Sequence, residues 1–475
     1  MIKSQIDYEI LPDTYIGKLL SSPAPKKRLS NQEAAALIQE TADRVEKERP
    51  NGDDRRIAEL MAAEAIRAIS GNGSSSLNWY TDSIDNALSV AGLIHPELVD
   101  EECVVSPFKS ASEARVVFFA ALSITSQNIK VFENVRYALE QYEQFKRHGR
   151  FVDASYGPKA QSVLRNLQRF NLALKTFGGD LSRLEAFLMK RFTMGEIRRV
   201  AEGFSINIGG AELNDEVVHG SMIFGPKIGN GFFQNLMGNH DPVTIDLWFM
   251  RMWGRYTGTL VKREIPKAAL TKLTAGIRKS LRSEKMTKVL RDAGLALKPS
   301  EIRALDPEEL ANYTKKLNHL WSRRRRAELE KGRTNDQILE IKTALGWANP
   351  AKAVYESLVG TVDTPRNGNE RRRMRAVTRQ SVDILRLKGY SMSPADLQAT
   401  LWYPEKELYG HLTGRDPGAM NVSYEQALVA AAKNEGYTDG EIDDAIEAGA
   451  GRSRRAGGDG CLERDAGRGG FQVSS

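Results

Sequence analysis

Cysteine is nearly absent from this chain. Its 475 residues include two cysteines, Cys103 and Cys461. That number excludes a disulfide framework, a multi-cysteine zinc site and a cysteine-ligated iron–sulfur cluster within the chain. Long apolar runs are also lacking: the longest strongly apolar run, Val116 to Leu122, is far shorter than the roughly 20 residues that cross a bilayer. We expect a cytoplasmic protein that uses no metal, no cofactor and no membrane.

Alternating strand patterns are scarce as well, and "FSINIGG" (204–210) is the one tempting example. Apolar spacings of three and four residues are common, and they begin after capping residues at Ser30, Asp180 and Thr193. A helical break is expected near Thr125 to Asn128. The pattern predicts an all-α fold. We divide it into a helical N-terminal region, a core, a basic helical region, a C-terminal helical region and a disordered tail: 1–105, 106–262, 263–361, 362–448 and 449–475.

Positive charge is concentrated after residue 261. The net charge is +7, and residues 262–333 contain 20 Lys and Arg against 9 Asp and Glu. This segment includes the consecutive residues Arg323, Arg324, Arg325 and Arg326. A solvated helical face and a surface that binds phosphates both fit such a segment.

The stretch "SMIFGPKIGNGFF" (221–233) combines glycines with a proline and a lysine. It predicts one helix over Asn214 to Phe224, a turn at Gly225, and a second helix with Pro226 at its first position. The free N–H groups at such a helix start suit a phosphate. Lys227 would lie in the first turn, where it could either neutralise that phosphate or act as an amine nucleophile.

An aspartate follows at a suggestive distance. In "PVTIDLWFMRMWGRY" (242–256) we expect a helix to begin at Thr244, which places Asp246 in the first turn, 19 residues after Lys227. Simple capping is the ordinary role of aspartate there. A role beside the lysine is the alternative.

These segments resemble the helix–hairpin–helix DNA glycosylase superfamily, nearest its bifunctional 8-oxoguanine and endonuclease III-like branches. "FGPKIGNGFF" looks like the hairpin, "VTIDLWFMR" like the aspartate segment, and "SITSQNIKV" (123–131) like an early junction between helices. The resemblance covers about residues 110–262. The chain departs from the family at Ile223, where the first hairpin glycine usually stands.

The resemblance implies a role for each matching residue. Lys227 would attack the deoxyribose and Asp246 would assist, while Gln127 would fill the gap left by an extruded base. The remaining residues implied to contact DNA are Gly225, Pro226, Gly229 and Arg251, beside the arginine run.

The expected function is therefore base excision from double-stranded DNA, with AP-lyase activity, by a monomer engaged in repair or in defence against modified foreign DNA. Three alternatives stay open: a helix–hairpin–helix protein that binds DNA without catalysis, an enzyme that processes hypermodified bases on the same fold, and a helical scaffold.

Overall fold

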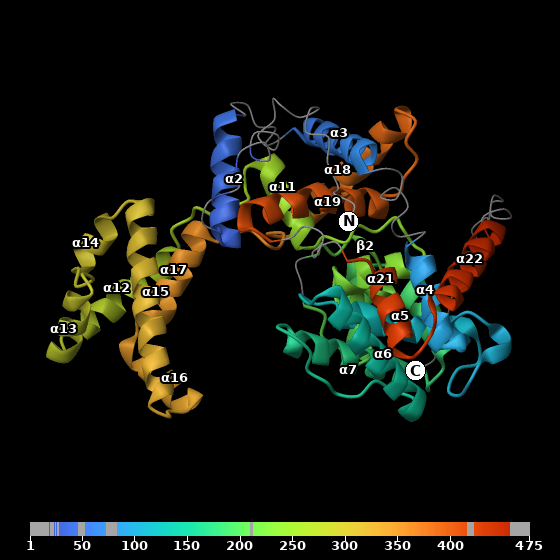
Figure 1. The fold of residues 1–475 in the computed structure, drawn as a ribbon. Coiled ribbons are helices and arrows are strands. Elements are labelled where there is room, and N and C mark those ends of the chain that lie inside the picture. Colours follow the sequence, from blue (N-terminus) through green and yellow to red (C-terminus); the bar gives the residue numbers. More distant parts are fainter. Residues whose placement is uncertain are drawn as a thin grey trace. The chain divides into compact units, whose positions relative to one another are not determined.

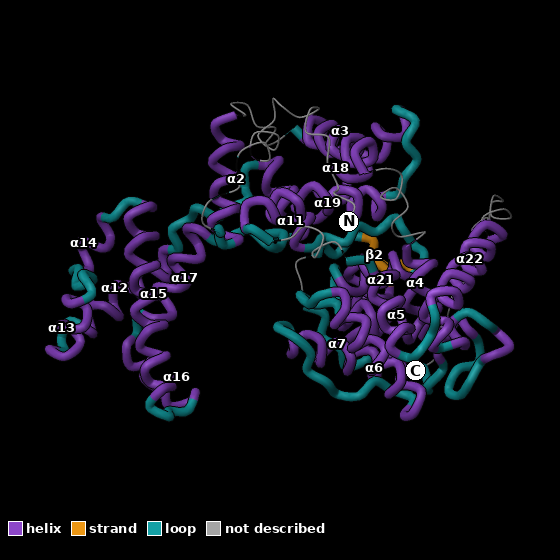
Figure 2. The backbone as a smooth tube through the Cα atoms, in the orientation of Figure 1, coloured by secondary structure: helices purple, strands orange, loops and turns teal. Residues whose placement is uncertain are grey.

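The computed structural model describes residues 19, 23, 25, 28–45, 53–72, 83–209, 212–415 and 422–456. These residues are mostly helical, and the one sheet among them has two strands (Figures 1 and 2). The expectation of a mainly α-helical fold is confirmed. No helix in the described ranges combines the length and apolar character that a membrane span requires.

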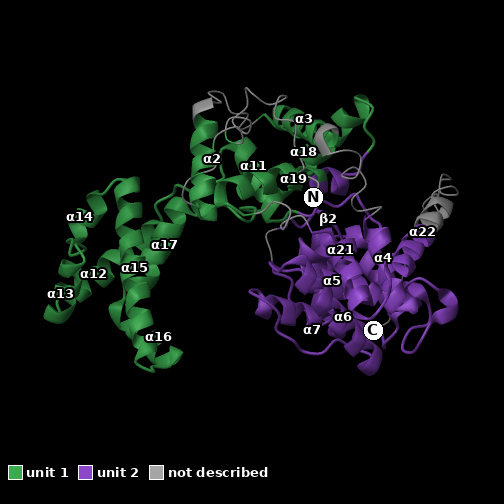
Figure 3. Ribbon diagram, in the orientation of Figure 1, with its two compact units in different colours: residues 1–73, 245–391, 400–421 green, residues 74–244, 392–399, 422–475 purple. Residues whose placement is uncertain are grey.

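Residue contacts divide the chain into two compact units (Figure 3). Unit 1 contains residues 1–73, 245–391 and 400–421, and unit 2 contains residues 74–244, 392–399 and 422–475. This division differs from the five consecutive ranges expected from sequence. The expected core, 106–262, contributes residues to both units, because its last helix packs with helices from the N- and C-terminal regions.

Unit 2 is built from helices around one short antiparallel ribbon (Figure 1). Its elements are α4 (Ile84–Ile94), η4 (Pro96–Leu98), η5 (Glu101–Cys103), α5 (Ala111–Thr125), α6 (Val131–His148), α7 (Ala160–Thr176), α8 (Leu181–Met189), β1 (Arg191–Thr193), α9 (Met194–Gly203), β2 (Val217–His219), η6 (Gly220–Phe224), η7 (Ile228–Phe233), α10 (Gln234–Leu236), α21 (Tyr424–Asn434) and α22 (Asp439–Ala456).

The regular elements of unit 1 are helices, apart from one isolated bridge between Val261 and Thr361 in its described residues. Its elements are α2 (Asn31–Val45), α3 (Asp54–Asn72), α11 (Leu247–Thr257), α12 (Lys267–Ser280), α13 (Glu284–Asp292), α14 (Pro299–Ala304), α15 (Pro307–Glu330), α16 (Asn335–Leu345), α17 (Ala348–Val359) and α18 (Gly368–Leu387). Helix α19 (Pro394–Thr413) begins in unit 2 and continues into unit 1.

Helices α12 to α17 form a bundle with a hydrophobic core of its own, in which Leu317 and Trp347 are fully buried. The chain enters and leaves this bundle through paired segments. Val261 and Thr361 form an antiparallel bridge, and Lys262 N–H donates to the Gly360 carbonyl at 3.0 Å. The bundle is therefore an insertion into unit 1, and its first and last residues lie beside each other. We call it the inserted bundle.

Capping chemistry sets several helix starts as expected. The hydroxyls of Ser30 and Thr193 and the carboxylate of Asp180 each accept a backbone N–H three residues later. Helix α5 ends at Thr125, within the expected break. These local signals are strong because a cap satisfies N–H groups that the helix itself leaves unpaired.

Two irregular segments can be compared with the sequence patterns. The one alternating pattern, "FSINIGG", forms no strand in its described part, because residues 206–209 have no regular structure; Gly210 lies outside the described residues. The strands lie at β1 and β2, where β-branched Val217 and Val218 pair across to Thr193 and Phe192. The expected disordered tail does not begin at residue 449, because α22 continues to Ala456. Residues 457–475 of that tail lie outside the described residues.

Candidate functional site

The expected first hairpin helix, Asn214 to Phe224, is wrong. The segment forms strand β2 followed by η6, a short 3-10 helix. Gly220 joins the two elements where the backbone passes close to α8, because an added Cβ would lie 1.9 Å from the carbonyl oxygen of Phe187. The backbone of η6 is then held from α7: Asn166 Nδ2 donates to the Phe224 carbonyl at 3.1 Å and Arg169 donates to the Ile223 carbonyl at 3.0 Å.

The turn that follows depends on Gly225. Its φ of 97° and ψ of 166° lie in a region that is essentially restricted to glycine. The helix after the turn begins at Ile228, two residues later than expected, and it is a π-helix. The cause is visible in the hydrogen bonds: the Gly225 carbonyl accepts from both Gly229 N–H (2.9 Å) and Asn230 N–H (3.2 Å). Such π-helical segments are rare and often occur at functional sites.

Gly229 has a packing role in this turn. An added Cβ would lie 1.6 Å from the Ser221 carbonyl oxygen, so only glycine allows η6 and η7 to approach this closely. The residue is buried, and its N–H is used by the Gly225 carbonyl. The resemblance implies that Gly229 contacts DNA, but its backbone N–H already donates to the Gly225 carbonyl.

Lys227 lies between the Gly225–Pro226 turn and η7. Two neighbouring polar side chains in the segment form hydrogen bonds. Ser221 Oγ donates to the Gly229 carbonyl at 2.9 Å, and Asn230 Oδ1 accepts the His219 N–H at 2.7 Å. The Lys227 side chain is half-buried and makes no hydrogen bond or ion pair within the described part of the chain. Among the described residues, the Lys227 amine therefore has no partner, and it directly follows the Gly225–Pro226 turn.

His219, beside this turn, is accounted for structurally. Asn239 Nδ2 donates to its Nε2 at 3.0 Å, which leaves the ring proton on Nδ1 for Asn230 Oδ1 at 3.2 Å. Burial lowers the pKa of His219. This neutral ring ties β2 to η7 and needs no catalytic role.

Asp246 is the N-cap of α11, so the expected helix start at Thr244 is wrong by three residues. Its Oδ1 accepts the Phe249 N–H at 2.9 Å. The cap shows the ordinary structural role of aspartate at this position, and it also fixes the carboxylate at a helix start. Asp246 belongs to unit 1 and Lys227 to unit 2, so the structure describes the two residues within separate units.

Arg251 is enclosed within unit 1. It is 3% exposed, and its guanidinium carbon lies 4.6 Å from the ring centroid of Trp248 and 4.0 Å from that of Tyr409. Its Nε has no hydrogen-bond partner among the described residues. Arg251 is therefore held between aromatic rings rather than displayed toward a phosphate, as the resemblance implies.

A second lysine lies in the same part of unit 1. Lys406 on α19 has its Nζ 5.3 Å from the Trp402 ring centroid and 6.0 Å from that of Tyr403. Burial lowers the pKa of Lys406, and the negative charge of Asp246 opposes that effect. The structure therefore brings Asp246 together with Lys406. The only sequence signal was an aromatic-rich helix, "LWYPEKELYGHL", with a lysine inside it.

Gln127 lies where the junction was expected, in the turn between α5 and α6. It is half-buried, and its Nε2 donates to the Ile124 carbonyl at 3.0 Å. Its neighbour Asn128 has a positive φ of 58°. The Gln127 amide therefore forms its hydrogen bond within the turn itself.

The arginine run does not act as one surface. Arg323 and Arg326 line a hollow of about 520 Å³ on the inserted bundle, whereas Arg324 is half-buried and Arg325 is exposed outside that hollow. Consecutive helical residues differ by about 100° in direction, which explains the division. Trp321 beside the run packs partly buried against the bundle core.

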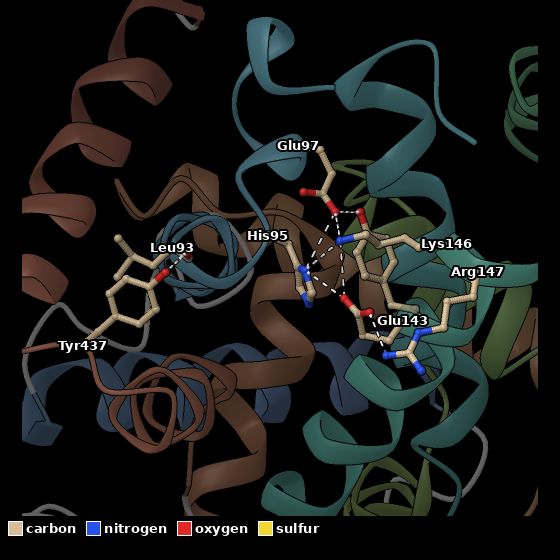
Figure 4. A network of polar contacts seen from close by, with 8 residues as sticks. Leu93, His95, Glu97, Glu143, Lys146, Arg147 and Tyr437 are labelled. Carbon is tan, nitrogen blue, oxygen red and sulfur yellow. Dashed lines mark hydrogen bonds and ion pairs between the residues drawn. The ribbon is translucent and has the colours of Figure 1, made fainter. Parts of the chain in front are cut away.

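A further group of titratable residues lies in unit 2 (Figure 4). Lys146 Nζ lies 2.9 Å from Glu97 and 3.3 Å from Glu143, and His95 Nδ1 lies 3.4 Å from Glu143. Burial lowers the pKa of His95. Burial alone would raise the pKa of Glu97, but the Lys146 hydrogen bond and charge help to bring it below its ordinary value. With Tyr142 also donating to Glu97, the group is a self-satisfied network typical of a structural role.

No possible metal site made of three or more His, Cys, Asp or Glu side chains occurs in the described ranges. No protein-family model, curated protein or solved structure matches this chain. The functional argument therefore depends on the residues themselves.

Proposed function

We propose that this protein is a DNA glycosylase with AP-lyase activity, which acts in the cytoplasm on chromosomal or foreign DNA. The observation that carries the proposal is Lys227, whose amine follows the Gly225 turn and has no partner among the described residues. Asp246 supports it, because a helix cap holds that carboxylate 19 residues further on. Lys227 and Asp246 have the order and the sequence separation that the resemblance to the glycosylase superfamily implies.

In this proposal an extruded nucleotide meets the lysine amine. Extrusion costs a few kcal/mol, least at a damaged or weakly paired base, and Gln127 fills the vacated space. The amine attacks the anomeric carbon, so that the C–N bond joins protein to sugar while the glycosidic bond breaks and the base leaves with the bonding pair. Asp246 stabilises the positive charge that develops on the sugar. The resulting imine permits β-elimination at the 3′ phosphate.

Lys406 is a second candidate for the amine. It interacts electrostatically with Asp246, and burial lowers its pKa, which favours the neutral, nucleophilic form. Lys227 remains the first choice because it lies in the segment that carries the resemblance. The two lysines predict different outcomes in one experiment.

The test is borohydride trapping on a panel of duplex oligonucleotides that carry lesions and natural modifications. The wild-type protein should give a covalent DNA adduct, Lys227→Gln should abolish it, and exposed Lys159→Gln should leave it unchanged. Asp246→Asn should lose excision while keeping DNA affinity. Loss of the adduct in Lys406→Gln together with its survival in Lys227→Gln would transfer the amine role to Lys406. No adduct and no abasic site with any substrate would reject the glycosylase.

A DNA-binding protein without excision activity is the second candidate function. The hollow lined by Arg323 and Arg326 favours it, because that basic surface lies far along the chain from both candidate lysines and needs no chemistry. Under this function, salt-sensitive DNA affinity would persist in a protein that produces no abasic sites.

A further inference from the structure

The hollow on the inserted bundle is lined on one side by α15. Five of its lining residues, spread over eleven positions of that helix, are polar or basic: Lys316, His319, Ser322, Arg323 and Arg326. Ala293 and Leu295, from the turn after α13, form the rest of the lining. A volume of about 520 Å³ is within the range of sites that hold ligands.

The basic residues of the hollow share one face of α15. Positions 316, 319, 323 and 326 follow the three-and-four spacing of a single helical face. Leu317 and Leu320 of the same helix are buried in the bundle core, so the basic face borders the buried side of α15. Side chains that leave the same helix face point the same way, so their positive charges add at one surface.

The charge of the hollow is not neutralised by the protein. Within the described ranges Lys316, Arg323 and Arg326 form no ion pair, and no acidic side chain lines the hollow. Neighbouring Lys315 differs, because it lies 3.9 Å from Glu33. Several like charges converging without counter-charges are costly unless an anion is bound.

The opposite wall of the hollow is fixed. Leu295 N–H donates to the Leu290 carbonyl at 2.7 Å through a turn in which Gly294 has a φ of 68°. Tyr313 Oη, from α15 itself, donates to the Leu295 carbonyl at 3.1 Å. The wall is therefore tied to the helix that carries the charges, and the hollow has a defined shape.

We propose that this hollow is a phosphate-binding site that grips the backbone of double-stranded DNA. The residues that line it include no Phe, Tyr or Trp, and the His319 imidazole is their one aromatic ring, so the three cations make it better suited to phosphates than to bases. Residues 316 and 326 are about 15 Å apart along the helix axis, long enough to follow several phosphates that rise about 3.4 Å each along one strand. The inference extends the proposed function by giving DNA a second contact, and it holds whether or not the protein excises bases.

The test measures affinity for an undamaged duplex, which no excision chemistry can alter. The hollow variant is Lys316→Gln/Arg323→Gln/Arg326→Gln in the full chain. The matched control, Lys272→Gln/Lys279→Gln/Arg282→Gln, removes the same charge from exposed positions of the same bundle that do not line the hollow. All six side chains are exposed, and thermal unfolding of both variants verifies that the bundle remains folded.

The slope of log affinity against log salt concentration should become shallower by about 3 in the hollow variant, about 1 for each lost phosphate contact. The control should change that slope by less than about 1. Equal slopes for the two variants, or a hollow variant that matches the wild type, would overturn the proposal. A hollow variant that keeps its DNA slope but loses affinity for thymidine monophosphate would also overturn it, because the site would then serve a free nucleotide. Because Lys227→Gln leaves the hollow intact, failure of the glycosylase proposal would not change these slopes.

Discussion

The two glycines around the candidate amine should respond differently to alanine. At Gly225 an added Cβ meets no atom within 4 Å, so the cost comes from the φ of 97° alone. Backbone strain of this kind costs about 1–3 kcal/mol. At Gly229 the same Cβ would lie 1.6 Å from the Ser221 carbonyl oxygen, which requires η6 and η7 to move apart. Overpacking costs about 1–3 kcal/mol and occasionally more, and the upper end applies here because the atom met is a backbone oxygen.

Urea unfolding followed by circular dichroism measures both costs. Exposed Gly238, with a φ of 84° and no atom near its added Cβ, supplies the control. We expect Gly229→Ala to lose the most free energy of unfolding and Gly225→Ala less, with Gly238→Ala losing about 1–2 kcal/mol. A Gly229→Ala protein that is more stable than Gly225→Ala would refute the close approach of η6 to η7. A loss below about 0.5 kcal/mol at Gly225 would refute the strained turn before Lys227.

Two further predictions concern buried charge. The Arg255 side chain is 1% exposed, and its guanidinium lies 2.8 Å from Glu64 and 2.9 Å from Glu405. Arg255→Met should lower the free energy of urea unfolding by about 3–5 kcal/mol, because two carboxylates lose their cation. A loss below about 1 kcal/mol would contradict this pairing. His95 has a folded pKa below its ordinary 6.5, so folding favours the neutral ring, and the melting temperature should fall as pH drops below about 6.5. His95→Gln should flatten that part of the profile, and an unchanged profile would exclude His95 as its cause.

Local signals predicted the helices well, because their determinants lie within a few residues. Ser30, Asp180 and Thr193 each satisfy N–H groups of the helix that they precede, and no distant contact is needed. The ribbon of β1 and β2 could not be predicted in this way. Each strand has three residues, which is too few to show an alternating pattern. Phe192 pairs with Val218, which lies far along the chain, so no local signal indicates the pairing.

The backbone geometry around Lys227 could not be predicted from the sequence. The π-helix after Lys227 depends on Gly229 and Gly231, whose added Cβ atoms would lie within 3 Å of Ser221 and Thr244. Those contacts are made by tertiary packing, which no helical spacing reports. Lys406 was missed for the same reason: it is about 160 positions from Asp246 in sequence, and only folding brings α19 beside the start of α11.

The arginine run shows how a sequence pattern can mislead about a surface. Four consecutive arginines suggest one patch, but a helix turns each of them about 100° from the last. The hollow uses only the first and fourth, together with Lys316 and His319 from outside the run. The informative signal was the spacing of three and four residues across 316–326, which is visible in the sequence once the segment is taken as a single helix. Charge density alone predicted a basic surface, whereas helical periodicity identifies which charges share one face of the helix.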